Sequence, residues 1–352
     1  MGLPVVHFVE PGGRGGIFQH TAELARLLVA EGGQAVIHTA ADCEALDFGE
    51  ITICGCVAWH RSVRFRALRV VLITTSYLFA TLPHLLRNTR GCVVHHQGLF
   101  KSPLYAIALW MLKWRAARTV FSPHNTFSRE GRIWQSAVLK WSMRHADRVV
   151  CYSRFDAARI ESWGLSPVVC PLVMWKPTVT AKEVADWRAR LSLGSRAAII
   201  LIPGQIRADK GIDQMILAAP FVGVPFTLAV VGEDKGDLSR CRLLAERRGV
   251  DVVWVARYLS LRELAGAIAA ADVVVLPYTV VSQSGVAALA NELGTPTVAY
   301  PIGGLSELAT VTAARCSPES LAESVLEVLT TRDTPRHEPL RASGIFRELY
   351  CQ

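Results

Sequence analysis

The stretch AAIILIPGQIRADKGID, residues 197–213, contains the pattern from which the fold can be predicted. The run at 197–203 is apolar and ends at a glycine, which is typical of a strand buried on both faces of a sheet. Two cations, Arg207 and Lys210, lie on the turn that follows. The next apolar residues recur at helical spacing, at positions Ile212, Met215, Ile216 and Ala219. A strand, a turn and a helix in this order form the repeating unit of a parallel α/β sheet.

The same alternation of short β-branched runs and amphipathic segments covers both halves of the chain. The predicted strands are PVVHFVE at 4–10, QAVIHTA at 34–40, CVVHHQ at 92–97, TVFSPHN at 119–125, RVVCYS at 148–153, then AAIILIPG, FTLAVVG at 226–232, VDVVWV at 250–255, DVVVLPY at 272–278 and PTVAY at 296–300. The pattern restarts after CPLVMWKPTVTAKE, residues 170–183, where two prolines interrupt it. We therefore predict an α/β protein of two doubly wound Rossmann-like domains that face each other across a cleft.

The predicted boundaries are an N-terminal domain over 1–174 and a C-terminal domain over 175–335, with a last helix over 336–352 packing back on the N-terminal domain. The length of 352 residues favours two domains, because single cores stop growing near about 250 residues. A hydrophobic content of 51% excludes a disordered chain. The apolar stretch at 70–86 is short for a membrane span and contains several polar residues, so we predict a buried strand followed by a helix there.

The nine cysteines are scattered and include no C-x-x-C pair, since Cys54 and Cys56 form only a C-x-C. This usage is typical of a reduced cytoplasmic chain rather than of a disulfide framework or a zinc site. The N-terminal residues show no basic region or cleavage pattern of a secretory leader. We therefore expect a cytoplasmic protein.

The net charge of +8 is concentrated at residues 101–150, which contain nine basic and two acidic side chains. A solvated basic face and a face for an anionic membrane or an acidic substrate are both compatible with this charge. No nucleic-acid motif accompanies it. The tryptophans of the region, which we expect to pack inside helices, are Trp110, Trp114, Trp134 and Trp141. Peripheral membrane contact stays open, because the apolar helix predicted at 103–114 lies close to the basic cluster.

Three loops that follow predicted strands have the composition of an anion site. PGGRGG, residues 11–16, opens the first helix, where glycines and the helix N-terminus favour a phosphate. Its spacing lacks the nicotinamide fingerprint. Gly204 and Gly211 flank the cations Arg207 and Lys210, a pair suited to a diphosphate. The third loop, YTVVSQSGVAALANELGTP at 278–296, offers hydroxyls and the start of another helix.

Taken in order, these motifs resemble the retaining, nucleotide-sugar-dependent glycosyltransferases of the GT-B fold, of the kind called family 4. The motifs that carry the resemblance are GGRGG, SPHN at 122–125, GQIRADKGID, VVGED at 230–234, LRELAGAIAAADVVVLPY at 261–278, SQSGVAALANELGTPTVAYPIGGLSE at 282–307 and FRELY near the C-terminus. The resemblance covers nearly the whole chain. It implies transfer of a sugar from a nucleoside-diphosphate sugar to an acceptor.

The resemblance also implies roles for single residues. Arg207 and Lys210 match the cationic pair on the donor diphosphate, and His124 matches a histidine near the donor sugar. The remaining donor-binding positions that it implies are Gly15, Gly16, Gly204, Arg257, Tyr258, Gln283, Ser284, Gly285 and Val286. No metal and no cofactor beyond the UDP- or GDP-linked co-substrate are expected, since no D-x-D motif is present and two cations can stabilise the leaving diphosphate.

The chain departs from the family at two positions. Many members have two glutamates where this sequence has Val281 and Leu289, so recognition of the ribose and the sugar is not explained. Glu292 lies one helical turn from Leu289 and is a candidate replacement, although a surface glutamate is the favoured interpretation. Glu307 is either structural or near the donor. His95 and His96 either contact an acceptor or simply end a polar strand. His20 is expected to face the cleft or solvent.

Two other functions compete with glycosyl transfer. One is a nucleotide-sugar epimerase or hydrolase on the same fold, and the other is a donor-binding partner subunit without catalysis. The intact cations and the SQSG sequence favour transfer. The acceptor is expected to be a saccharide, a lipid-linked sugar or a natural product, as in the synthesis of cell-surface polysaccharide or glycoconjugates, and the enzyme to act in the cytoplasm or at the inner face of the membrane.

Overall fold

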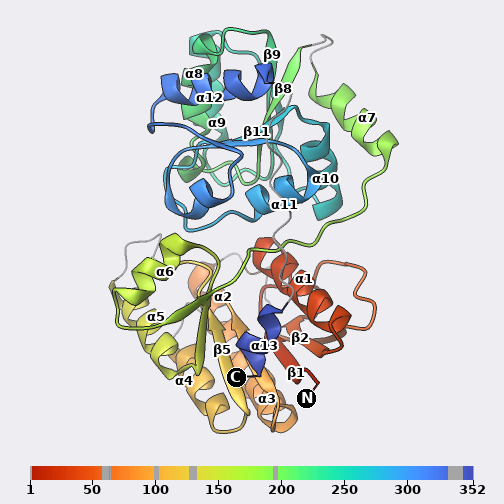
Figure 1. The fold of residues 1–352 in the computed structure, drawn as a ribbon, viewed down its shortest axis with the longest axis vertical. Coiled ribbons are helices and arrows are strands. Elements are labelled where there is room, and N and C mark those ends of the chain that lie inside the picture. Colours follow the sequence, from red (N-terminus) through yellow and green to blue (C-terminus); the bar gives the residue numbers. More distant parts are fainter. Residues whose placement is uncertain are drawn as a thin grey trace. The chain divides into compact units, whose positions relative to one another are not determined.

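The computed structural model describes residues 2–57, 63, 65–98, 103–126, 133–192, 197–331 and 344–351. These residues form two compact units. Unit 1 contains the chain up to Trp175 together with the C-terminal segment, and unit 2 begins at Lys176. Both units are built on parallel sheets with helices on their faces (Figure 1).

Unit 1 has a seven-stranded sheet in the order β3-β2-β1-β4-β5-β6-β7, and every pairing is parallel. The strands are β1 (Val5–Val9), β2 (Gln34–Ala40), β3 (Thr52–Val57), β4 (Val93–Gln97), β5 (Arg118–Ser122), β6 (Arg148–Cys151) and β7 (Pro167–Val169). The helices are α1 (Gly16–Ala30), α2 (Arg66–Ser76), the π-helical turn η1 (Tyr77–Thr81), α3 (Leu82–Asn88), α4 (Pro103–Lys113), α5 (Ile133–His145), α6 (Arg154–Glu161) and α13 (Ile345–Tyr350). The strand order reverses between β1 and β4, which makes this the switch point of the sheet.

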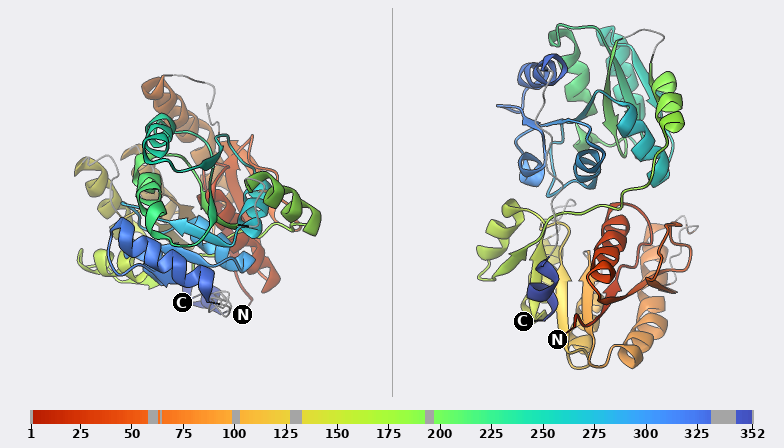
Figure 2. Two further views of the ribbon diagram at one scale, coloured as in Figure 1. Left: turned by 90° about the horizontal axis from the view of Figure 1, so that it is seen from above. Right: turned by 45° about the vertical axis from the view of Figure 1, so that its right-hand side comes forward.

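The last helix, α13, belongs to unit 1 although the whole of unit 2 precedes it in the chain. It lies beside β1 and β5 in both side views (Figures 1 and 2). Phe346, Leu349 and Tyr350 are buried there. The Tyr350 hydroxyl lies 2.9 Å from Nδ1 of His95 on β4, so the helix is fixed by a polar contact as well as by apolar packing.

Unit 2 has a six-stranded parallel sheet in the order β10-β9-β8-β11-β12-β13. The strands are β8 (Ala198–Pro203), β9 (Phe226–Val231), β10 (Val252–Val255), β11 (Val273–Leu276), β12 (Thr297–Ala299) and β13 (Val311–Thr312). The α-helices are α7 (Ala181–Leu191), α8 (Ile212–Ala218), α9 (Leu238–Arg248), α10 (Leu261–Ala270), α11 (Gly285–Leu293) and α12 (Pro318–Thr330). Short 3₁₀ turns are η2 (Ala208–Lys210), η3 (Ala219–Phe221) and η4 (Gly303–Glu307). Here the strand order reverses between β8 and β11.

Helices cover both faces of the unit 2 sheet, α8, α9 and α12 on one side and α7, α10 and α11 on the other (Figure 1). The core on the first face is almost entirely aliphatic and joins β8, β9 and β11 to α8 and α12. Helix α8 buries Ile212, Met215 and Ile216 as its spacing predicts, but its fourth buried position is Ala218 rather than Ala219, because the helix tightens to a 3₁₀ turn at residue 219.

The prediction of a strand within residues 70–86 is wrong. The whole segment is helical, running through α2, η1 and α3. Its buried residues include Ile73, Tyr77 and Leu85, which follow helical spacing, while Phe79 is exposed on the other side. Apolar residues on both sides of a helix look like a continuous strand when only the sequence is read. The π-helical turn directly precedes the helix start that contains Pro83, a residue with no N–H to donate.

No helix among these described residues is both long enough and apolar enough to cross a bilayer.

The packing role predicted for the tryptophans is wrong for three of them: Trp110, Trp114 and Trp141 are exposed, Trp114 by 78% of its surface. The side chain of Trp134 lies outside the described residues. Trp110 on α4 and Trp114 directly after it pack against each other, and we call this pair of exposed indoles the tryptophan face.

Candidate functional site

The switch point of unit 2 gathers the loops that follow β8, β9 and β11. In a parallel sheet, ligands bind beyond the carboxyl ends of the strands where the strand order reverses. The loop after β8 contains both predicted cations, and the loop after β11 leads to α11. The candidate donor site is built from these loops.

The loops after β8 and β9 are locked together through their backbones. Gly204 donates its N–H to Val231 at 2.9 Å, Ile206 to Glu233 at 2.9 Å, and Lys235 to Ile206 at 2.9 Å. Gly232 has φ 148°, and a Cβ there would lie 1.8 Å from the carbonyl oxygen of Gly204. Only glycine therefore allows the two turns to approach this closely, and the loop that holds the cations has a fixed backbone.

The two cations are held in different ways. The Arg207 guanidinium forms a two-point ion pair with Asp209, through Nε and through Nη2, the latter 2.7 Å from Oδ2. The Lys210 ammonium lies 3.5 Å from the centroid of the Tyr278 ring, in a cation–π contact. The partner Asp209 and the ring of Tyr278 were not predicted from the sequence. Both cations are thus oriented before any ligand arrives.

Backbone contacts join this loop to the one that follows β11. Thr279 donates its N–H to the carbonyl of Asp209 at 3.1 Å. Gly211 has φ 61°, and a Cβ there would lie 1.9 Å from the carbonyl oxygen of Pro277. The loop after β8, which contains Gly204 and Lys210, therefore lies against the residues that follow β11.

Helix α11 begins beside Gly204. Ser284 is its N-cap, with Oγ accepting a hydrogen bond from the N–H of Ala287 at 3.3 Å. A Cβ at Gly204 would be 3.8 Å from Cγ2 of Val286 in the first turn. Gly285 is the first helical residue. The predicted donor-binding residues Gly204, Ser284, Gly285 and Val286 therefore share one place, at a helix N-terminus whose dipole favours an anion.

The positions where many family members have glutamates are filled by the core. Val281 and Leu289 are both buried. The candidate replacement Glu292 is half-buried, and its backbone carbonyl accepts a hydrogen bond from Lys176. Glu307 is exposed at the end of η4. Among the described residues, we therefore identify no carboxylate that takes the place of the two glutamates.

The loop after β10 presents Arg257 and Tyr258 at the surface. Arg257 donates from Nη2 to Glu263 at 2.6 Å and from Nη1 to the carbonyl of Tyr258 at 3.0 Å. The Arg257 contact is the main cause that lowers the pKa of Glu263 to about 2. With its side chain engaged in this way, Arg257 gives the loop a defined shape.

In unit 1, the glycine-rich loop after β1 is organised by Glu10. Its carboxylate accepts from the N–H of Gly12 at 3.0 Å and of Gly13 at 2.7 Å. These two amides are therefore occupied, whereas Gly15 is the N-cap of α1 with φ 78°, and open space lies where a Cβ of Gly15 or Gly16 would stand. Arg14, on the same loop, pairs with the exposed Asp42 at 3.6 Å.

His124 follows β5 and belongs to a buried network at the unit 1 switch point. Its Nε2 donates to Oε1 of Gln97 at 2.7 Å, and its ring stacks on Tyr152 with centroids 5.0 Å apart. The Tyr152 hydroxyl donates to Oγ of Ser122 at 2.9 Å. Desolvation by burial, with smaller contributions from His20 and His95, places the pKa of His124 well below its usual value, so the ring is neutral near pH 7.

The remaining histidines of this region are buried. Of the two alternatives for His20, exposure to solvent is wrong: its side chain is inaccessible, and Nδ1 lies 2.7 Å from the carbonyl of Val173. Burial lowers the pKa of His20 to about 4. His95 lies between Tyr350 and Ser122, and His96 is equally buried.

Comparison with known proteins matches both halves of the chain to glycosyltransferases. Residues 14–174 match the family model described as Glycosyltransferase Family 4, and residues 197–331 match the model described as Glycosyl transferases group 1. The two models together match most of the chain, and with the structural relatives given below they identify a nucleotide-sugar glycosyltransferase of GT-B type.

Among curated proteins, a D-inositol 3-phosphate glycosyltransferase of Xylanimonas cellulosilytica is 37% identical over 122 residues, which are 34% of this chain and 29% of that protein. The matched part is thus less than a third of the curated relative. Among solved structures, sucrose-phosphate synthase from Thermosynechococcus elongatus has a TM-score of 0.73 at 18% identity, covering 99% of this chain and 95% of that one. Anabaena HepE in complex with UDP has a TM-score of 0.65 at 16% identity and covers 99% and 96%. These structures confirm the predicted fold of two Rossmann-like domains.

Proposed function

We propose that this protein is a retaining glycosyltransferase that works without a catalytic metal and moves a sugar from a UDP- or GDP-linked donor to an acceptor. The observation that carries the proposal is the arrangement at the unit 2 switch point, where Arg207 and Lys210 lie on a rigid loop connected to the N-terminal side of α11. Two oriented cations and a helix N-terminus are the groups that a diphosphate requires.

In the proposed reaction the bond from the sugar to the diphosphate breaks while the acceptor hydroxyl forms the new glycosidic bond. Negative charge builds on the leaving diphosphate, and Arg207 and Lys210 stabilise it in place of a divalent ion. The leaving phosphate accepts the proton of the acceptor hydroxyl on the same face of the sugar, so no pair of carboxylates is needed. This agrees with Val281 and Leu289, which are buried apolar residues.

The ion pair between Arg207 and Asp209 is suited to a site that binds an anionic ligand. Asp209 neutralises and orients the guanidinium, and the donor diphosphate replaces it as the partner of Arg207. The Tyr278 ring holds the Lys210 ammonium by a cation–π contact, and this contact orients the ammonium for the diphosphate. Arg257 and Tyr258 are assigned to the nucleotide base, and Gln283, Ser284, Gly285 and Val286 to the distal phosphate.

His124, Gly15 and Gly16 are assigned to the sugar and acceptor side. The neutral His124 ring, held by Gln97, is suited to hydrogen bonding with sugar hydroxyls rather than to pairing with phosphate. A saccharide, a lipid-linked sugar or a natural product is the proposed acceptor, with cell-surface polysaccharide or glycoconjugate synthesis as the setting.

The tryptophan face supports peripheral contact with the inner face of the membrane as part of this proposal. Trp110 and Trp114 pack edge to face with centroids 6.1 Å apart, and Ile107 and Met111 of the same helix are also exposed. Exposed indoles beside basic residues are typical of surfaces that bind the interface of an anionic bilayer. Sedimentation of the purified protein with vesicles tests this part. We expect more protein to bind anionic than zwitterionic vesicles, and we expect this difference to be lost when Trp110 and Trp114 are changed to Ser.

The first experiment is a thermal-shift panel of UDP, GDP, ADP and dTDP and their sugar conjugates, with and without EDTA. We expect one nucleotide to raise Tm, and we expect EDTA to leave that increment unchanged. Arg207→Ala should lose the increment, while Arg247→Ala, an exposed arginine on α9, should keep it. No increment from any nucleotide would mean that donor binding is lost, and an increment without turnover would favour the donor-binding partner subunit. Turnover of the donor without an acceptor would favour an epimerase or hydrolase.

A further inference from the structure

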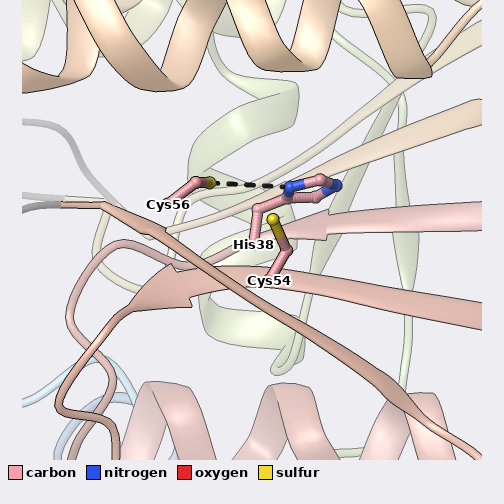
Figure 3. Close-up of side chains that lie close together, drawn as sticks. All are labelled: His38, Cys54 and Cys56. Atoms are coloured by element: carbon pink, nitrogen blue, oxygen red, sulfur yellow. Dashed lines mark hydrogen bonds between the residues drawn. The ribbon is translucent and has the colours of Figure 1, made fainter.

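Three side chains with metal-binding atoms lie together at one edge of the unit 1 sheet (Figure 3). The imidazole of His38 and the thiols of Cys54 and Cys56 have ligand atoms that all lie within 4.8 Å of one another. The C-x-C spacing explains part of this arrangement, because alternate residues of a strand point to the same face. His38 on β2 is in register with Cys54 on β3, which completes the group.

A second imidazole, that of His84 on α3, lies beside this group. Nε2 of His84 is 3.3 Å from Sγ of Cys54, and the His84 ring centroid is 5.6 Å from that of His38. His38 in turn has Nδ1 at 3.7 Å from Sγ of Cys56. Two imidazoles and two thiols from three separate elements therefore converge.

The other nitrogen of His38 already has the partner that a metal ligand needs. Nε2 lies 2.8 Å from Nδ1 of His7 on β1, and the two rings stack with centroids 5.1 Å apart. A histidine that binds a metal almost always uses its second ring nitrogen in a hydrogen bond, which fixes the tautomer and the ring plane. With Nε2–H donated to His7, the lone pair of Nδ1 faces the two thiols. The cysteine backbone is fixed as well, since the Thr81 hydroxyl donates to the carbonyl of Cys56 at 2.8 Å.

We propose that His38, Cys54, Cys56 and His84 bind one Zn²⁺ ion, with His7 as the positioning residue for His38. Two thiolates and two imidazoles are a common tetrahedral set for structural zinc. Binding exchanges two S–H bonds for two S–Zn bonds and releases two protons, so the ion and its thiolates together carry no net charge. A neutral group suits a partly buried place better than a free divalent ion does.

The ion would join the edge strand β3 to β2 and to α3. An edge strand has unpaired backbone groups on one side, and a metal crosslink to a covering helix protects it from pairing with other chains. The site belongs to unit 1 and takes no part in the proposed transfer, which uses the cations of unit 2. The inference therefore stands independently of the donor and acceptor.

The first test measures zinc in the purified protein and after reloading of the EDTA-treated protein with ZnCl₂. We expect one equivalent bound per chain, and loss of that equivalent in Cys54→Ser and Cys56→Ser but not in Cys92→Ser, a cysteine of the same unit outside the cluster. Reloading with Co²⁺ should give thiolate-to-metal charge transfer and the intense visible bands of a tetrahedral site. Binding that is absent, or that persists in both serine variants, would overturn the proposal, as would an octahedral Co²⁺ spectrum.

Two further measurements separate metal binding from a simple loss of folding. In the wild-type protein, ZnCl₂ should protect Cys54 and Cys56 from alkylation, whereas the exposed Cys351 should react at the same rate with or without the ion. His7→Gln should weaken zinc affinity by about 10- to 100-fold, the range for partners of metal-binding histidines, without changing the form of the Co²⁺ spectrum. Equal alkylation with and without zinc would contradict the site. The thermal increment given by a nucleotide should be the same in all these variants, which separates this site from the donor site.

Discussion

The two units have the same kind of sheet but different interiors at their switch points. Unit 1 buries imidazole, amide and phenol groups, with His20, His95 and His124 all inside it. The corresponding interior of unit 2 is mainly aliphatic, with the phenols of Tyr278 and Tyr300 beside it, and the cations Arg207 and Lys210 lie on the loop that follows β8. A parallel sheet accepts either interior, provided that the buried polar groups find partners. Neutral polar groups suit hydroxyl-bearing ligands and cations suit phosphates, so the difference agrees with the division of labour proposed for the two units.

Acidification should give the largest difference in stability between the two units. Burial lowers the pKa of His20 to about 4 and moves those of His95 and His124 well below their usual value. The unfolded chain then binds more protons as pH falls below about 6.5, and each such histidine removes up to about 1.4 kcal/mol of stability per pH unit. The carboxylates of unit 2 act later, since Glu263 has a pKa lowered to about 2 and loses its contribution only as pH falls below about 4.5.

Hydrogen exchange followed by mass spectrometry at pH 7, 6 and 5 would test this order. We expect peptides of β4 and β5 to lose protection before those of β8 and β11. A chain in which both units lose protection in parallel, or unit 2 first, would show that the buried histidines do not control acid stability.

Gly232→Ala should damage unit 2 alone. A Cβ at this position meets the Gly204 carbonyl at 1.8 Å, so the loops after β8 and β9 would have to separate. We expect a loss of about 4 kcal/mol in the free energy of unfolding of unit 2, which is the range of severe backbone strain. The control is Gly223→Ala, where φ is 75° but open space surrounds the new atom, with an expected cost of about 1 kcal/mol. Urea unfolding of both variants gives the two values, and equal costs would mean that the close approach is unimportant.

Arg207→Ala should reduce kcat for sugar transfer by about 10²-fold, as for other preorganised groups that stabilise developing charge. The stability of unit 2 should change little, because Arg207 is partly exposed and its ion pair is local. Lys210→Ala should have a similar effect on turnover. Arg247→Ala serves as the matched control. Unchanged kinetics in both the Arg207 and Lys210 variants would remove the donor site from this loop.

Asp209→Asn should have the smallest effect of these substitutions, and it should strengthen donor binding rather than weaken the function of the site. Removing the carboxylate frees the Arg207 guanidinium for the donor, so we expect nucleotide affinity to rise by about two- to five-fold, the worth of a partly exposed ion pair. Calorimetric titration of the wild-type and variant proteins with the nucleotide that raises Tm in the thermal-shift panel measures this change in affinity. Weaker binding would mean that Asp209 orients Arg207 for the diphosphate more than it competes with it.

The sequence predicted unit 2 better than unit 1, and the reason is physical. Strands such as β8 and β11 are unbroken aliphatic runs, and their short length and the glycine or proline that follows favour a strand over a helix. Strand β3 contains Gly55 between two cysteines and was not predicted. The segment 70–86 was assigned to the wrong structure because its apolar residues lie on two sides of a helix.

The donor loops could be found because Gly204, Lys210 and Ser284 occur within short motifs. Their partners could not, since nothing in the spacing of residues 207–210 shows that Arg207 pairs with Asp209 or that Lys210 rests on Tyr278, which is far along the chain. The cysteine and histidine cluster is a stronger case. Its ligands come from residues 38, 54, 56 and 84, and only the register of β2 with β3 and the position of α3 bring them together.

The position of α13 has a consequence for the order of events during protein synthesis. Residues up to 175 leave the ribosome first, yet the Tyr350 hydroxyl that pairs with His95 and the buried ring of Phe346 come after all of unit 2. Domains generally fold as they emerge, the N-terminal one first. Unit 1 therefore stays incomplete, with part of its interior open, while unit 2 is made and folds, and α13 then completes the unit that was begun first.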